Sequence, residues 1–322
     1  MVDRELTEPL PGQVRLKVLT CGVCHSDVLA VEGLRADPSS PVVPGHEVVG
    51  VVDAVGAGVT EWRVGERVGV GFLGGQCGRC ERCRRGDFVN CLDQDQIGTT
   101  VDGGYAEVVF ARASGLVRIP EALSSVDAAP LLCAGLTTYQ ALRRIDSRPG
   151  ALVAVQGLGG LGHLGVQYAS KLGYRVAVVA RGTAKAELAA RLGADHYVDS
   201  TVEDPGEALR ALGGATAIVA TAASGASMSP LVAGLAPRGH LVVVGAAPDP
   251  LTVHTVDLLF GTRTISGSLT GTSIENEDNL AFSARQNIRP MTEVLPLAEA
   301  PRAYERMLSG QARFRVVLEV AA

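Results

Sequence analysis

Short runs of β-branched and other apolar residues, separated by glycines, recur from residue 14 to about residue 119. The runs cover residues 14–20, 48–55, 66–71 and 106–110. Short apolar runs with such frequent turn residues between them are typical of an all-β region. Residues 77–91, between the third run and the fourth, are polar and rich in cysteine. We therefore predict a mostly β domain that carries a small lobe without strands.

The pattern changes after Pro130. Apolar runs that read as buried strands now alternate with helical stretches such as residues 184–192; the strands are expected at residues 152–156, 175–179, 217–220 and 240–244. Strands and helices that alternate at this interval predict a parallel, doubly wound sheet. In the last fifty residues we expect one amphipathic helix, residues 298–309, and a final strand, residues 314–320.

These patterns together predict an α/β chain with two domains, and its 322 residues suffice for two hydrophobic cores. The mostly β domain should comprise residues 1–133 and, after the chain returns, residues 270–322. The parallel sheet should occupy residues 134–269.

Residues 151–170 contain no Asp, Glu, Lys or Arg, and an uncharged stretch of this length matches a membrane span. The stretch also contains several glycines together with Gln156, His163 and Gln167, and its apolar spacing changes partway. A strand, a turn and a helix explain these features better than a membrane helix does. We expect no membrane segment.

The net charge of −5 argues against a nucleic-acid-binding face, which would be basic. The region after Met1 lacks the basic and apolar stretches of an export signal. The seven cysteines are an odd number, and several are spaced Cys-x2-Cys. These features favour a cytoplasmic protein whose thiols bind metal instead of forming disulfides.

Six of the seven cysteines fall into two patterns. The first is the run Cys77, Cys80, Cys83 and Cys91, whose four thiolates would complete the tetrahedral shell of a structural zinc ion. The second combines Cys24, His46 and Cys133, which would leave a fourth position for a substrate or water. Cys21 is an alternative ligand to Cys24, although buried packing is the commoner role of a free cysteine.

A glycine-rich motif follows the strand predicted at residues 152–156 and opens a helix at residues 163–172. The motif consists of Gly157, Leu158, Gly159, Gly160, Leu161 and Gly162. Between a strand and a helix this pattern indicates a dinucleotide-binding loop, in which backbone amides at the positive end of the helix approach the pyrophosphate.

The end of the second predicted strand bears on the choice of cofactor. An NAD site usually has Asp or Glu there to bind the ribose 2′-hydroxyl. This chain has Arg181, Thr183 and Lys185 instead, which can hold a 2′-phosphate. Arg181 as an ordinary solvated cation is the alternative. We predict that NADP(H) is preferred, with NAD(H) as the alternative.

Six segments, in order along the chain, resemble the zinc-dependent alcohol dehydrogenases of the medium-chain dehydrogenase/reductase superfamily. They are residues 21–27, 44–47, 77–91, 102–107, 132–139 and 157–162. The resemblance implies a GroES-like, mostly β catalytic domain and a Rossmann cofactor domain. It also implies two Zn2+ ions per chain, with the catalytic ion on the Cys2His set known for alcohol dehydrogenases, here Cys24, His46 and Cys133.

The resemblance implies roles for four neighbours of that set. Ser26 would begin a proton relay, and His25 would either continue it or contact the cofactor pyrophosphate. Asp27 would accept a hydrogen bond from the zinc-bound histidine, and Glu47 would lie beside the metal. In the cofactor site, Thr137 aligns with a residue near the nicotinamide and Arg315 with an arginine that contacts phosphate.

The implied reaction is hydride transfer between a nicotinamide cofactor and an alcohol, aldehyde or ketone. Two alternatives are reduction of an imine or activated alkene on the same scaffold and a zinc-bearing relative without turnover. The implied partners are a small-molecule substrate and further copies of the chain, as a dimer or tetramer. Relatives usually begin with about twenty more residues that form a strand pair, so a chain without them would leave a sheet edge exposed.

Overall fold

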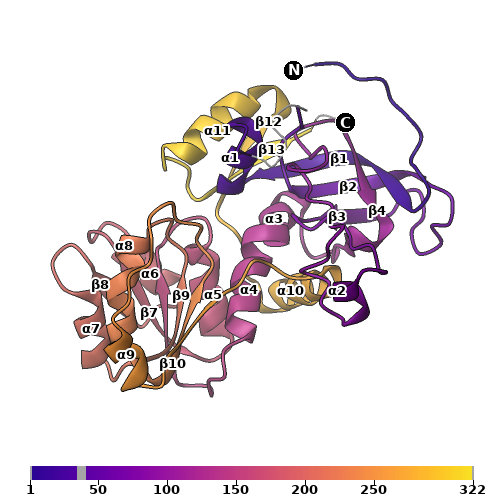
Figure 1. The fold of residues 1–322 in the computed structure, drawn as a ribbon. Helices are drawn as coiled ribbons and strands as arrows, with labels where there is room; N and C mark the ends of the chain where they lie inside the picture. The colour runs from indigo at the N-terminus through magenta and orange to yellow at the C-terminus, as the bar shows by residue number, and fades with distance from the viewer. Residues whose placement is uncertain (1, 35–40, 321–322) are drawn as a thin grey trace. The chain divides into compact units, whose positions relative to one another are not determined.

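The computed structural model describes residues 2–34 and 41–320. The chain forms two compact units (Figure 1). The first unit contains Met1–Leu136 and Gly271–Ala322, and the second contains Thr137–Thr270. The first unit is therefore discontinuous in sequence, because the chain returns to it after completing the second.

The first unit is built on a seven-stranded sheet in which β1 (Gln13–Val23) is central. The other strands are β2 (Glu47–Val55), β3 (Arg67–Val70), β4 (Val108–Arg112), β5 (Leu116–Arg118), β12 (Thr292–Pro296) and β13 (Arg315–Glu319). The strand order is β12-β13-β1-β2-β3-β5, and β4 pairs with β1 beside β13. Val14, Leu16 and Val18 of β1 are buried, as the period of two predicts.

Helices, most of them short, lie along the chain between these strands. They are η1 (His25–Asp27), α1 (Val28–Val31), α2 (Glu81–Arg84), η2 (Ala113–Gly115), α3 (Ser125–Pro130), the π-helix η3 (Leu131–Gly135), α10 (Ser273–Gln286), η5 (Leu297–Glu299) and α11 (Ala300–Leu308). The prediction of one helix in the last fifty residues was wrong, because α10 lies there as well as α11. Helix α10 escaped prediction because it buries Asn276, Asn279 and Ser283 where an apolar stripe would be expected.

The second unit is a six-stranded, wholly parallel sheet. Its strands are β6 (Leu152–Gln156), β7 (Arg175–Ala180), β8 (His196–Asp199), β9 (Ala215–Ala220), β10 (Leu235–Val243) and β11 (Thr264–Gly267). The order β11-β10-β9-β6-β7-β8 is that of the Rossmann fold, with its switch point between β6 and β9. Every residue of β6 is buried, as in a sheet covered on both faces.

The helices of the second unit are α4 (Leu136–Arg143), α5 (Gly162–Lys171), α6 (Ala186–Arg191), α7 (Pro205–Ala211), α8 (Gly225–Met228), η4 (Ser229–Gly234) and α9 (Thr255–Leu259). The uncharged stretch at residues 151–170 forms β6, the glycine turn and most of α5, as predicted. Within residues 2–34 and 41–320, none of the helices combines the length and the hydropathy that a membrane crossing requires.

Candidate metal and cofactor sites

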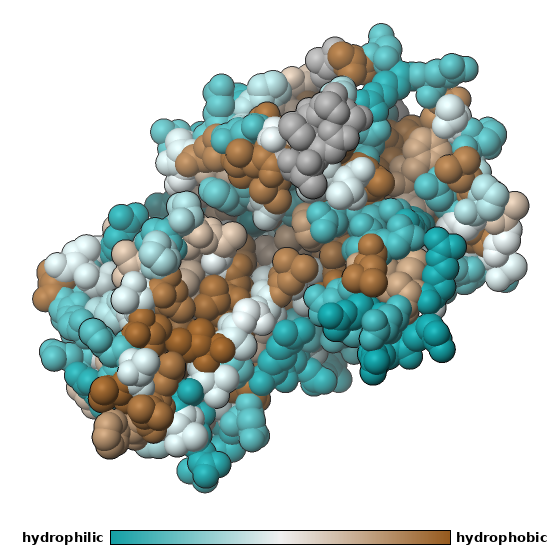
Figure 2. Space-filling view, viewed as in Figure 1, coloured by the Kyte–Doolittle hydropathy of each residue, from teal (hydrophilic) through white to brown (hydrophobic). Residues whose placement is uncertain are grey.

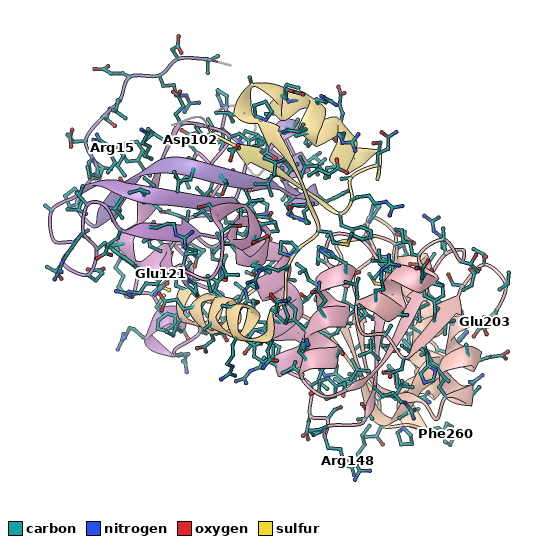
Figure 3. All side chains as sticks on the ribbon, turned by 180° about the vertical axis from the view of Figure 1, so that it is seen from behind. Arg15, Asp102, Glu121, Arg148, Glu203 and Phe260 are labelled. Carbon is teal, nitrogen blue, oxygen red and sulfur yellow. The ribbon has the colours of Figure 1, made fainter. Side chains whose placement is uncertain are left out.

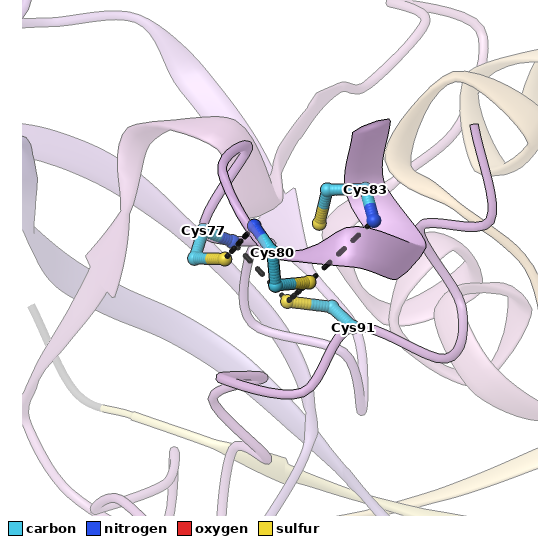
Figure 4. A group of neighbouring side chains, drawn as sticks. All are labelled: Cys77, Cys80, Cys83 and Cys91. Carbon is cyan, nitrogen blue, oxygen red and sulfur yellow. Dashed lines mark hydrogen bonds between the residues drawn. The ribbon is translucent and has the colours of Figure 1, made fainter. Parts of the chain in front are cut away.

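The four cysteines of residues 77–91 converge around α2 (Figure 4). Their sulfur atoms lie within 4.8 Å of one another, and all seven cysteines of the chain are free thiols. A tetrahedral shell with Zn–S bonds of about 2.3 Å needs sulfurs about 3.8 Å apart. The 4.0 Å between the Sγ atoms of Cys80 and Cys91 is close to that spacing.

Backbone amides point at the sulfur atoms of this cluster. The bonds are Cys80 N to Cys77 Sγ at 3.4 Å, Cys83 N to Cys80 Sγ at 3.5 Å, and Cys77 N to Cys91 Sγ at 3.3 Å. Hydrogen bonds from the amides of Cys83 and Leu92 lower the pKa of Cys80 to about 6, whereas burial raises the pKa of Cys83 to about 12. Amide donors directed at sulfur favour thiolates, which are the metal-binding form of cysteine.

The second group is in the same unit and consists of Cys24, His46, Glu47 and Cys133. One potential ligand atom from each residue lies within 4.8 Å of the other three. Cys24 follows β1 directly, His46 and Glu47 stand at the start of β2, and Cys133 lies in the π-helix η3. Three segments that are distant in sequence thus meet where the sequence analysis predicted a shared metal.

The members of this group shift one another's pKa values. A hydrogen bond from the Cys133 thiol, aided by the nearby His46, holds the pKa of Cys24 well below its usual range. Burial opposes the protonated form of His46, but the Asp27 carboxylate and Cys24 together raise the imidazole pKa well above its ordinary value. Within the described part of the chain, the buried Nε2 of His46 has no hydrogen-bond partner of normal geometry. Two sulfur atoms and an imidazole nitrogen in one buried cluster match the ligand types that zinc prefers.

Asp27 holds the other side of the imidazole. Its Oδ1 lies 2.9 Å from Nδ1 of His46, and both side chains are almost fully buried. Its Oδ2 accepts hydrogen bonds from the Cys24 amide and the Tyr105 hydroxyl, each at 2.8 Å. Asp27 therefore lies beside Nδ1 of His46, and the hydrogen bond that the sequence analysis expected between them stays a prediction.

Glu47 forms a buried ion pair with Arg315 of β13. Burial raises the pKa of Glu47 to about 7, although the Arg315 guanidinium acts in the opposite direction. Arg315 thus lies beside Glu47 in the first unit, and its expected contact with a cofactor phosphate stays a prediction. The side chains of His25 and Ser26 are exposed, one and two residues after Cys24. Their relay roles also stay predictions.

Two buried asparagines support the π-helix that carries Cys133. A π-turn lacks the regular α-helical bonding pattern and is frequent at functional sites. Here Nδ2 of Asn279 donates to the Leu131 carbonyl at 2.9 Å, and Nδ2 of Asn276 donates to the Leu132 carbonyl at 3.1 Å. The sequence analysis missed both residues and assigned no role to Tyr105, although it singled out the motif at residues 102–107.

The glycine motif of the second unit forms a tight turn from β6 into α5. A Cβ atom at Gly162 would lie 1.8 Å from the Gly157 carbonyl oxygen, whereas a Cβ at Gly159 would meet no atom within 4 Å. The backbone of the turn is thus tightly packed at Gly162, whereas the space beside Gly159 is free of protein atoms. This arrangement suits a loop whose backbone is approached by a phosphate group. Thr137, buried in α4 of the same unit, lies 3.4 Å from the Leu269 carbonyl.

Two hydrogen bonds to Gly182 hold the loop after β7 in place. The Gly182 amide donates to Asp199 Oδ1 at 2.7 Å, and the Tyr197 hydroxyl donates to the Gly182 carbonyl at 2.7 Å. Arg181 is exposed on this loop, while Lys185 donates to the Leu158 carbonyl of the glycine motif at 2.8 Å. Lys185 therefore links the two loops of the predicted cofactor site.

Two family models match the chain. Residues 10–121 match the alcohol dehydrogenase GroES-like domain, and residues 160–285 match the zinc-binding dehydrogenase model. The alcohol dehydrogenase notN of Aspergillus sp. (strain MF297-2) is 43% identical over 317 residues, which are 98% of this chain and 93% of that protein. An alcohol dehydrogenase of Geobacillus stearothermophilus is 41% identical over 311 residues, 96% and 92% of the respective chains.

Solved structures agree with these matches. The cinnamyl alcohol dehydrogenase SbCAD4 of Sorghum bicolor has a TM-score of 0.89 and 34% identity, with 98% of this chain and 92% of that chain covered. The fold, the two family models and near full-length identity above 40% all agree. The chain therefore belongs to the zinc-type alcohol dehydrogenases of the medium-chain dehydrogenase/reductase superfamily.

Proposed function

We propose that this protein is a zinc-dependent alcohol dehydrogenase or carbonyl reductase that prefers NADP(H). It would transfer hydride between the cofactor and an alcohol, or the corresponding aldehyde or ketone. The observation that carries this proposal is the convergence of Cys24, His46 and Cys133 around the unpartnered Nε2 of the imidazole. With Glu47 paired to Arg315, two sulfurs and one ring nitrogen would leave the fourth position to a substrate oxygen, which is the requirement of a catalytic site.

Cys24, His46 and Cys133 would hold the catalytic ion, and the four cysteines of residues 77–91 would hold a structural one. Zinc in the first site would supply Lewis acidity toward a substrate oxygen. We propose that Asp27, whose Oδ1 lies 2.9 Å from Nδ1 of His46, orients the imidazole so that Nε2 would face the two sulfurs. Ser26 and His25, which are exposed beside Cys24, are the groups that we propose carry the substrate proton toward solvent.

Glu47 completes the buried surroundings of the proposed ion. Its carboxylate offers a ligand atom within 4.8 Å of the other three, and Arg315 neutralises its charge. We propose that Glu47 and Arg315 balance the charge beside the metal.

The cofactor would bind the second unit at the glycine motif. We propose that Gly157, Gly159, Gly160, Leu161 and Gly162 surround the pyrophosphate and that Thr137 lies near the nicotinamide. Arg181 and Lys185 would face the 2′-phosphate. In support, Arg181 is exposed on a loop that Asp199 and Tyr197 hold in place.

Cofactor choice is tested by Ala180→Asp at the end of β7. A carboxylate at this position can accept a hydrogen bond from the ribose 2′-hydroxyl of NAD and repels a 2′-phosphate. We expect the ratio of kcat/KM for NADPH to that for NADH to fall at least about tenfold, equivalent to about 1.4 kcal/mol. Steady-state kinetics with both cofactors measure this ratio. Equal use of the two cofactors by the unmodified protein would contradict the NADP(H) preference.

The proposed reaction is tested by the substrate range of the purified protein. With NADPH, we expect turnover of aldehydes or ketones that stops when zinc is removed by a chelator and returns when zinc is restored. The panel should also contain imines and enones. Zinc-independent reduction of an enone would favour alkene reduction on this scaffold. No hydride transfer across the whole panel, in either direction, would favour a zinc-bearing relative without turnover.

We further propose that the chain assembles with copies of itself. In the second unit, Leu259 and Phe260 are 73% and 90% exposed, and β11 lies at the edge of the sheet. Figure 2 shows apolar surface over this part of the unit, and Figure 3 shows Phe260 on its outside. An apolar patch near an open strand edge is typical of a protein interface. Light scattering would give the mass of the assembly.

A further inference from the structure

The motif at residues 102–105 runs alongside residues 43–45, the segment directly before His46. Three successive amides of the motif donate to its carbonyl groups: Gly103 N to Val43 O at 2.7 Å, Gly104 N to Gly45 O at 2.9 Å, and Tyr105 N to Pro44 O at 3.0 Å. In return, the Val43 amide donates to Asp102 Oδ1 at 2.8 Å. Asp102 is labelled in Figure 3. The backbone leading to His46 is therefore bonded residue by residue to this motif.

Residues 102–105 and residues 43–45 lie too close together to leave room for a side chain at Gly103. A Cβ atom at Gly103 would lie 2.1 Å from the Gly45 carbonyl oxygen and 2.6 Å from that of Pro44. Both obstacles are backbone atoms, which cannot move aside as a flexible side chain would. The glycine is needed here for close approach.

The next residue of the motif reaches the imidazole through a carboxylate. The Tyr105 hydroxyl donates to Asp27 Oδ2 at 2.8 Å, while Oδ1 of the same carboxylate lies 2.9 Å from Nδ1 of His46. Burial raises the pKa of Tyr105 well above its usual value, so the phenol keeps its proton and remains a donor. A carboxylate held at one oxygen by a hydroxyl and by the Cys24 amide has its other oxygen fixed toward the ring.

We propose that residues 102–105 form a brace that fixes His46 as a metal ligand, with Tyr105 as a positioning residue acting through Asp27. The backbone bonds fix the chain next to His46, and the Tyr105 hydroxyl fixes the carboxylate that orients the ring. The inference rests on the proposed function in one respect, namely that His46 binds the metal. Loss of a group that orients a metal ligand typically weakens metal binding by about 10- to 100-fold.

The test is Tyr105→Phe, which removes one hydroxyl and keeps the ring. Zinc affinity is measured for the whole protein by competition with a chromogenic chelator, and cobalt(II) substitution reports the ligand geometry by absorption. We expect affinity at one of the two zinc sites to fall about tenfold, with a shifted cobalt spectrum at that site. The thermal midpoint should change little. Tyr304→Phe is the matched control, because its hydroxyl contacts Glu32 at the surface of the same unit.

A double substitution shows whether Tyr105 acts through Asp27. In an Asp27→Asn background, the further change Tyr105→Phe should add little, because coupled residues are not additive. Unchanged zinc affinity in Tyr105→Phe, or a full additive loss in the Asp27→Asn background, would overturn the brace. If the unmodified protein bound zinc only at the four-cysteine cluster, the proposed function itself would fail, and this outcome is seen before any substitution is made.

Discussion

Cys133→Ser is expected to lower the zinc content from two ions per chain to one. It should also reduce kcat/KM with NADPH and a carbonyl substrate by more than about 100-fold. Loss of a residue that only supports a metal ligand typically costs about 10- to 100-fold, and Cys133 is proposed as a ligand itself. The substitution replaces one sulfur of a three-residue set with an oxygen that binds zinc poorly at neutral pH. Asn276 and Asn279 would still hold the π-helix, so the fold around position 133 should persist. Elemental analysis and steady-state kinetics measure the two effects.

Cys21→Ser is the matched control. Cys21 lies three residues before Cys24, but its thiol is fully buried in the core of the first unit, and burial raises its pKa well above the usual value. Among the described residues, the group of convergent ligand atoms contains Cys24, His46, Glu47 and Cys133 and does not include Cys21. We expect Cys21→Ser to retain two zinc ions per chain. Loss of zinc in this variant, or two full sites in Cys133→Ser, would contradict the assignment of the ligands.

Two glycines of the cofactor loop should respond differently to the same added methyl group. Gly162→Ala would place Cβ 1.8 Å from the Gly157 carbonyl oxygen, so β6 and α5 must move apart. We expect the free energy of unfolding to fall by about 3 kcal/mol. Gly159→Ala meets no protein atom within 4 Å and should leave stability unchanged. It should instead weaken NADPH binding about tenfold, or about 1.4 kcal/mol, because the methyl group keeps the pyrophosphate from the backbone.

Thermal or denaturant unfolding measures the first effect, and titration of NADPH fluorescence measures the second. Each variant serves as the control for the other, because they differ only in which side of the turn receives the methyl group. Normal NADPH affinity in Gly159→Ala would argue against this loop as the pyrophosphate site. Normal stability in Gly162→Ala would show that the turn can relax without cost.

The hydrophobic pattern predicted the strongest elements well. Strand β6 was predicted at residues 152–156 and has those bounds, because each of its residues is buried and apolar or lies at the strand end. Strands β8 and β11 were missed because they lie at the edges of the sheet, where fewer apolar residues are needed. Helix α10 was missed although it is partly buried. Its buried face contains asparagines, whose side chains donate hydrogen bonds to backbone carbonyls, where the hydrophobic pattern would require apolar residues.

In the candidate site, likewise, the proposed metal ligands were predicted from the sequence and the residues that support them were not. The residue types and the family resemblance predicted that Cys24, His46 and Cys133 share a metal, and in the structure their ligand atoms lie within 4.8 Å of one another. The supporting residues gave no such signal. Asn276 and Asn279 stand 144 and 148 residues along the chain from the carbonyls that they bind. Such contacts form only in the folded chain. The sequence around a polar residue in a helix does not indicate whether that residue is buried.

The discontinuity of the first unit determines the order in which a ribosome can complete this molecule. The second unit emerges whole, whereas the first must wait for its final fifty residues, which bring the partners of Leu131, Leu132 and Glu47. Because domains fold as units during synthesis, the Rossmann sheet can form on the nascent chain while the thiols of Cys24 and Cys133 still lack their finished surroundings. We therefore expect the proposed zinc ion to enter that centre late, after synthesis of the chain is complete.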